Sequence, residues 1–228
     1  MARFQLPAVG QGVFDSVFGY VYTGLAVNLS LVAANFPLAA ALVLVRDPLA
    51  AWPFLLLLSL TVAPSLAAAF AAFRALADGG TAPFGAFWRG WLRTLRPAFL
   101  VGLGVGALAL VIGLDLATTA GTPVGALLAP VLLVVLAVVC AAAAITLAVV
   151  CERVAEGTDA SLGAAAKASV YLAVRHAPLS ALTLVVLGAA AAAVLAQPVF
   201  GALLAVSPLL YLAWANSRYA LLRVRSAA

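Results

Sequence analysis

The sequence predicts an all-α fold, a polytopic bundle of transmembrane helices that occupies residues 1–228 as a single integral membrane domain. Hydrophobic residues make up 67 % of the chain and charged residues only 8 %, a composition far outside the range of soluble domains. The apolar residues gather into six long stretches, each near the roughly 20 residues that a helix needs to cross hydrocarbon. Because backbone polar groups cannot remain unpaired in lipid, these stretches are expected to be helical.

Windows of about twenty residues define the six expected spans and their order. Residues that favour turns lie between them: Arg46-Asp47-Pro48, Asp78-Gly79-Gly80, Gly121-Thr122-Pro123 and Gln197-Pro198. The six predicted transmembrane helices are 22–45, 52–75, 98–117, 124–150, 179–195 and 200–222.

The positive charges predict how this chain is oriented. Only Arg46 of the twelve basic residues falls on one side of the six spans. By the positive-inside rule the opposite side, with both termini, is cytoplasmic. An odd number of spans would divide the charge between the two faces, which favours six. The eleven residues on the cytoplasmic side are Arg3, Arg74, Arg89, Arg93, Arg96, Arg153, Lys167, Arg175, Arg218, Arg223 and Arg225.

The net charge of +5 indicates interaction with a membrane surface rather than with nucleic acid. The basic residues lie beside apolar spans and not in a polar, folded basic domain. The expected counter-charge is therefore the headgroups of anionic lipids in the bilayer.

The connection between the second and third spans contains a predicted interfacial amphipathic helix. Six apolar residues recur at the i, i+3, i+4, i+7 spacing of one helical face, and three arginines occupy the other. Burying such a face would stabilise the helix by on the order of 10 kcal/mol, against roughly 1 kcal/mol for each arginine near anionic lipid. The helix either shapes the turn between two spans or docks a cytoplasmic partner. Its residues include Phe84, Phe87, Trp88, Trp91, Leu92 and Leu95 on the apolar face and Arg89, Arg93 and Arg96 on the other.

The connection between the fourth and fifth spans repeats this plan more faintly. It also starts with a basic residue, Arg153, and ends with another, Arg175, just before the next span. We therefore expect a second cytoplasmic surface helix, and the two units would then be parallel repeats.

Four polar side chains within predicted spans form a candidate intramembrane polar site. Asn28 and Asn35 are seven residues apart and hence on one face of a continuous helix. Their amides are expected to hydrogen bond between helices, or alternatively to line a polar cavity together with Asn216 of the last span. Asp115 falls near the outer end of its span, as an exposed interfacial carboxylate or a solute contact.

The sequence favours no enzymatic activity. It has a single histidine, His176, without cysteine or carboxylate at ligand spacing. No paired membrane carboxylates and no H-E-x-x-H motif occur. A nucleophilic mechanism would therefore lack the base that activates the nucleophile, and a metal mechanism would lack further ligands for the ion. We expect no catalytic residue, no metal and no cofactor.

The chain resembles the YesL family of bacterial polytopic membrane proteins over most of its length. The resemblance depends on three groups of residues: Asn28-Leu29 with Pro37; Pro64 with Ala67, Ala68, Ala69 and Phe70; and Phe87, Trp91, Arg93 and Arg96. It implies a multi-pass protein of the bacterial cytoplasmic (inner) membrane, in a family associated with ABC-type carbohydrate uptake.

Two functions are compatible with these observations. The first is a non-enzymatic accessory or regulatory component of such an importer, whose partner is an ABC-type permease or a second copy of the chain. The alternative is a small-solute transporter or channel that uses a polar face in the helix bundle.

Overall fold

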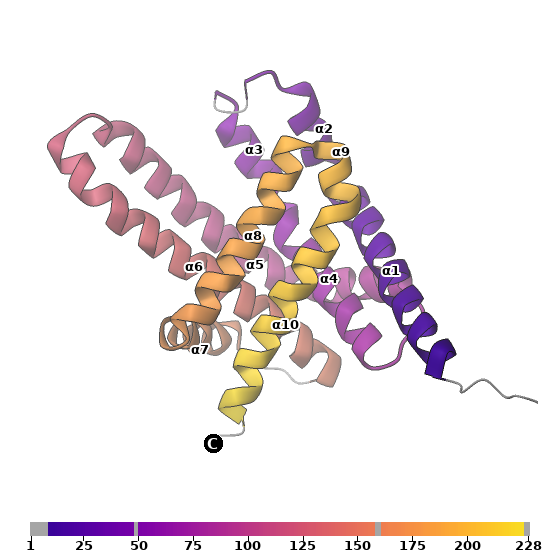
Figure 1. The fold of residues 1–228 in the computed structure, drawn as a ribbon. Helices are drawn as coiled ribbons and strands as arrows, with labels where there is room; N and C mark the ends of the chain where they lie inside the picture. The colour runs from indigo at the N-terminus through magenta and orange to yellow at the C-terminus, as the bar shows by residue number, and fades with distance from the viewer. Residues whose placement is uncertain (1–8, 48–49, 158–160, 226–228) are drawn as a thin grey trace, which may run out of the picture.

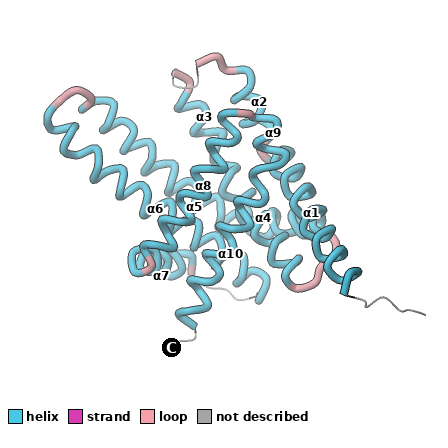
Figure 2. The backbone as a smooth tube through the Cα atoms, viewed as in Figure 1, coloured by secondary structure: helices cyan, strands magenta, loops and turns pink. Residues whose placement is uncertain are grey.

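The computed structural model describes residues 9–47, 50–157 and 161–225, and every regular element in these ranges is helical (Figure 2). Arg3 of the predicted cytoplasmic charges lies outside them. The elements are α1 (Val9–Ala34), α2 (Phe36–Leu44), α3 (Trp52–Leu58), the 3-10 turn η1 (Ser59–Thr61), α4 (Val62–Ala77), α5 (Pro83–Thr119), α6 (Pro123–Glu156), α7 (Leu162–Arg175), α8 (Ala177–Ala196), α9 (Pro198–Phe200), the π-helical turn η2 (Gly201–Ala205) and α10 (Val206–Arg225).

Five segments within the described ranges are long and apolar enough to cross a membrane. The predicted helical, multi-pass membrane fold is thereby confirmed. The sixth predicted span, 200–222, is divided among α9, η2 and α10 and is not among the five. The five segments are Val17–Ala34, Trp52–Ala77, Pro83–Thr119, Pro123–Glu156 and Ala177–Ala196.

The connections between the long helices gather at two ends of the bundle (Figure 1). The α2–α3, α5–α6 and α8–α9 connections lie at the upper end in this view, whereas the α4–α5 connection, α7 and the C-terminus lie at the lower end. The paired helices α5 and α6 project from the bundle as a hairpin. The lower end therefore contains the connections that the sequence predicts to be cytoplasmic.

The first predicted span, 22–45, is not one helix, and this prediction was wrong. The chain breaks at Asn35, whose φ of −110° and ψ of 23° leave the α-helical region. Pro37 lies in the first turn of α2, the place in a helix where the missing proline N–H costs least. The Asn35 side chain occupies the break by donating to the carbonyl oxygen of Leu31 at 2.9 Å.

The predicted surface helix is helical but is not a separate element. It forms the first part of α5, which continues through Pro97 into the predicted span 98–117 over 37 residues. At about 1.5 Å per residue this helix is roughly 55 Å long, well beyond a hydrocarbon core of about 30 Å. The separate boundary predicted at residue 98 was therefore wrong, because Pro97 alone did not end the helix.

The core lies where α4 packs against α5, α6 and α1. Half of the buried residues of α4 are alanines, and Phe70 and Phe73 are among the others. Small residues permit close approach on the facing helix: a Cβ added at Gly90 of α5 would lie 2.5 Å from the Cβ of Ala71. A Cβ at Gly102 would lie 2.8 Å from that of Ala63. These contacts bring the backbones of α4 and α5 close together.

Candidate functional site

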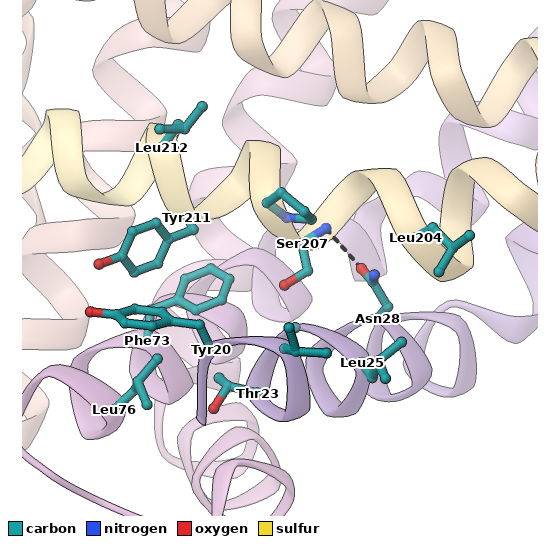
Figure 3. A pocket seen from close by; sticks show the side chains of 13 residues that line it. Tyr20, Thr23, Leu25, Asn28, Phe73, Leu76, Leu204, Ser207, Tyr211 and Leu212 are labelled. Atoms are coloured by element: carbon teal, nitrogen blue, oxygen red, sulfur yellow. Dashed lines mark hydrogen bonds between the residues drawn. The ribbon is translucent and has the colours of Figure 1, made fainter. Parts of the chain in front are cut away.

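Asn28 connects α1 to the junction between η2 and α10. Its side-chain Nδ2 donates to the carbonyl oxygen of Leu203 at 2.8 Å, and its Oδ1 accepts from the backbone N–H of Ser207 at 2.8 Å (Figure 3). In a regular α-helix the Ser207 N–H would donate directly to Leu203, four residues earlier. The amide of Asn28 is thus inserted into the hydrogen-bond ladder of the last helix and satisfies both groups.

Two features explain why the ladder is open at this point. The preceding turn, η2, is π-helical, so its backbone hydrogen bonds are shifted by one residue relative to an α-helix. The next residue, Pro208, has no N–H and cannot donate to Leu204. The buried amide of Asn28 in α1 therefore supplies hydrogen bonds to the backbone groups of Leu203 and Ser207 that the helix itself leaves unpaired.

A groove of about 520 Å³ lies beside Asn28, between α1, α4 and α10. Figure 3 shows Tyr20 and Tyr211 at one end of it and Leu204 at the other. The Tyr211 ring packs edge-on against Phe73 and against Tyr20, with centroid separations of 5.4 and 5.8 Å. Most of the lining is apolar, so the groove suits a hydrocarbon chain better than a polar solute.

The three asparagines that the sequence places in spans hydrogen bond to different partners in the described part of the chain. Asn35 accepts a hydrogen bond from Thr61 Oγ1 of η1 at 2.9 Å. The Asn216 side chain donates to the Leu179 carbonyl oxygen and to Thr183 Oγ1 of α8, both at 2.6 Å. Of the three, only Asn28 lines the groove described above. Each amide thus connects a different pair of elements.

Asp115 lies near the C-terminal end of α5, and its side chain is exposed. Its backbone carbonyl oxygen accepts from the hydroxyl of Thr119 at 2.6 Å. The residue is on the projecting part of the α5–α6 hairpin and is not among the residues that line the groove beside Asn28.

The residues predicted to form the partner face separate into two groups on the first part of α5. Phe87 is fully buried against the core, and Trp88 packs edge-on against both Phe87 and Trp91. The middle of this apolar face therefore packs against protein, where a lipid contact was expected, whereas Phe84 and Leu92 are 49 % and 68 % exposed. The exposed side chains of this segment include Arg89, Arg93 and Arg96.

Sequence reasoning missed a cluster of charged residues where α4, α6 and α10 meet. Glu152 Oε2 of α6 lies 3.1 Å from Arg74 Nη1 of α4, and Oε1 lies 3.9 Å from Arg218 Nε of α10. Arg74 also donates to the backbone oxygen of Glu152 at 2.9 Å. The guanidinium of Arg218 lies over the ring of Trp214, 5.3 Å from its centroid. The Arg74 and Glu152 side chains are only 19 % and 15 % exposed, so this ion pair is largely desolvated.

A pocket of about 370 Å³ adjoins this cluster, between α6, α7 and α10. Three side chains that line it, Glu152, Arg153 and Ser169, each have a buried polar atom without a hydrogen-bond partner in the part of the chain that the structure describes. The sequence signal was an acidic residue among basic ones at the end of the fourth apolar stretch. That signal does not say which distant arginine the carboxylate faces.

The fold and these sites define a multi-pass helical membrane protein in which the side-chain amides of Asn28 and Asn216 join helices. Within the described ranges, no group of three or more histidine, cysteine, aspartate or glutamate residues is placed to hold a metal ion. No family model, no curated protein and no solved structure matches the chain.

Proposed function

We propose that this chain is a non-enzymatic accessory or regulatory component of an ABC-type carbohydrate importer in the bacterial cytoplasmic membrane. In this proposal six spans cross the bilayer, both termini are cytoplasmic, and the protein acts through contacts with a permease. The resemblance to the YesL family supplies the connection with carbohydrate uptake.

One observation carries the preference for an accessory role over transport. The amides of Asn28, Asn35 and Asn216, which could have lined a solute path, are hydrogen bonded to three different elements. A transported polar solute needs several polar groups that converge on one cavity. Here those groups stabilise the contacts between helices, as expected of a protein whose surface carries its function.

The partner surface in this proposal is the exposed arginine face of α5. Arg89, Arg93 and Arg96 are exposed and belong to a helix anchored by the buried Phe87. A rigid helix that presents three positive charges at the predicted cytoplasmic end fits an acidic surface on a partner.

Co-purification tests this proposal. The tagged chain, isolated from its native membrane in mild detergent, is expected to bring an importer permease with it, and its deletion is expected to lower carbohydrate uptake. A variant with Arg89, Arg93 and Arg96 changed to Gln should lose the permease. Arg46→Gln, on the opposite predicted face, should retain it. Isolation as a lone protein together with unaltered uptake in the deletion strain would exclude the accessory role.

A small-solute transporter is the second candidate, because Asn28 borders the groove between α1 and α10. Purified protein in lipid vesicles would then carry solute faster than empty vesicles do, and Asn28→Leu would slow that flux. Equal flux in loaded and empty vesicles would eliminate this candidate.

A further inference from the structure

The pocket between α6, α7 and α10 combines unpaired polar atoms with a positive local charge. Arg74, Arg153 and Arg218 line it together with Glu152 and Glu156, so arginines outnumber carboxylates by one. Glu152 Oε2 lies 3.1 Å from Arg74 Nη1, whereas Oε1 lies 3.9 Å from Arg218 Nε and has no hydrogen-bond partner among the described residues. Arg153 is the third arginine of the pocket, and its Nη1 has no hydrogen-bond partner among the described residues.

Two hydrogen-bond donors in this pocket have no acceptor within the described residues. Nη1 of Arg153 and Oγ of Ser169 are both buried and unpaired, and the whole Ser169 residue is 0 % exposed. A buried guanidinium N–H without a partner is costly, because the charged group has lost water without gaining a hydrogen bond. A group that supplies oxygen acceptors and negative charge would remove that cost.

The other residues that line the pocket indicate the chemistry of the rest of the ligand. Val149, Leu172 and Leu221 form an apolar part of the same pocket. The volume of about 370 Å³ is within the range of small-molecule sites and exceeds the needs of one or two waters. Tyr171 and Val174 of α7, which do not line the pocket, are about 60 % exposed.

We propose that this pocket binds a phosphate ester, held by Arg153 and Ser169, with Glu152 fixing the other two arginines around it. This is a discrete site, beyond the general attraction of exposed arginines to anionic lipid, and it does not depend on the importer role. The same phosphate chemistry occurs in two sources, the headgroup of an anionic phospholipid and a soluble phosphate ester.

The test measures binding to the purified full-length protein in detergent. Native mass spectrometry gives the dissociation constant of the first bound phosphatidylglycerol, with diacylglycerol, which lacks the phosphate, as the uncharged comparison, and glycerol 3-phosphate is added as the soluble competitor. The variants are Arg153→Gln, Arg153→Lys and Ser169→Ala. The matched control is Arg175→Gln, which removes the same charge from an exposed side chain that donates to the Tyr171 hydroxyl of its own helix at 3.0 Å.

We expect Arg153→Gln to weaken the first phosphatidylglycerol by about tenfold or more relative to Arg175→Gln, since a hydrogen bond to a charged group is being removed. Arg153→Lys should retain part of the affinity. If Arg153→Gln fails to fold, Ser169→Ala, which changes no charge, is expected to show a several-fold loss.

The two sources give different results. Phosphatidylglycerol binding that glycerol 3-phosphate does not displace identifies a lipid site, and displacement by glycerol 3-phosphate identifies a soluble ester. Equal weakening by Arg153→Gln and Arg175→Gln would show diffuse surface attraction and overturn the proposal. It would equally be overturned if neither compound bound, which would leave a pocket that holds only water.

Discussion

The insertion of Asn28 into the last helix makes a quantitative prediction for Asn28→Leu. The substitution keeps the approximate volume of the side chain but removes both hydrogen bonds, to the Ser207 N–H and to the Leu203 carbonyl. Hydrogen bonds between transmembrane helices are each worth about 0.6 to 2 kcal/mol, and an unpaired buried group costs about 1 to 3 kcal/mol. Since a direct Ser207–Leu203 bond can partly re-form, we expect a loss of about 2 to 3 kcal/mol in unfolding free energy.

The native cysteines allow this loss to be measured. Cys151 is 4 % exposed and Cys140 is partly buried, and both are free thiols. A thiol-reactive fluorescent dye therefore reports unfolding as the protein is heated in detergent. For a chain of this length the loss corresponds to a fall in melting temperature of about 5 to 10 °C.

Two further variants make the interpretation specific. Gln197→Leu replaces an exposed amide with leucine and should leave the melting temperature nearly unchanged. Asn28→Asp retains an acceptor for Ser207 but faces the Leu203 carbonyl with a second oxygen, so it should lose at least as much stability as Asn28→Leu. If Asn28→Leu melted with the wild-type protein, the inserted amide would not stabilise the helix junction and the reasoning would be refuted.

Three other changes have definite expected outcomes. Glu152→Gln removes the carboxylate that faces Arg74 and Arg218, and dye-monitored unfolding should show a loss of about 2 to 4 kcal/mol in unfolding free energy. Adding Arg74→Gln to the same chain should restore part of that free energy, and strictly additive losses would contradict the ion pair. Gly102→Ala should destabilise the folded protein by about 1 to 3 kcal/mol, because the new Cβ would lie 2.8 Å from the Cβ of Ala63. Gly104→Ala, whose new Cβ has no atom within 4 Å, should be neutral or slightly stabilising. Equal effects of the two substitutions would argue against the close α4–α5 contact. A cysteine at Gly121 should react with an impermeant thiol reagent only from outside the cell, and labelling only from the cytoplasmic side would reverse the proposed orientation.

Much of the secondary structure followed from the hydrophobic pattern. The fourth and fifth predicted spans, 124–150 and 179–195, lie within α6 and α8, which extend six residues further at the end of α6 and one or two at the other ends, because uninterrupted apolar runs specify helices in lipid. The two wrong boundaries both concern proline. Pro37 accompanied a break whereas Pro97 did not, and a proline in sequence does not reveal whether neighbouring groups will support the helix on either side of it.

The candidate sites were less predictable. Seven-residue spacing placed Asn28 and Asn35 on one face of a continuous helix, but the break at residue 35 directs the second amide to Thr61. Glu152 was not singled out, since it was one charged residue at the end of a long apolar stretch. Its partners, Arg74 and Arg218, are 78 and 66 positions away along the chain, and charge spacing says nothing about contacts at that separation.

By itself, the amino-acid sequence predicted that this protein lies in a membrane, that it is helical, and which connections lie on the same side. It could do so because placing a polar backbone group or a charge in hydrocarbon is unfavourable for each residue separately. Only the tertiary structure decided which helix each polar side chain serves. An amide or carboxylate in an apolar setting must find a partner, but the identity of that partner depends on how the helices pack. That packing is why Asn28 completes the last helix and Glu152 joins three others.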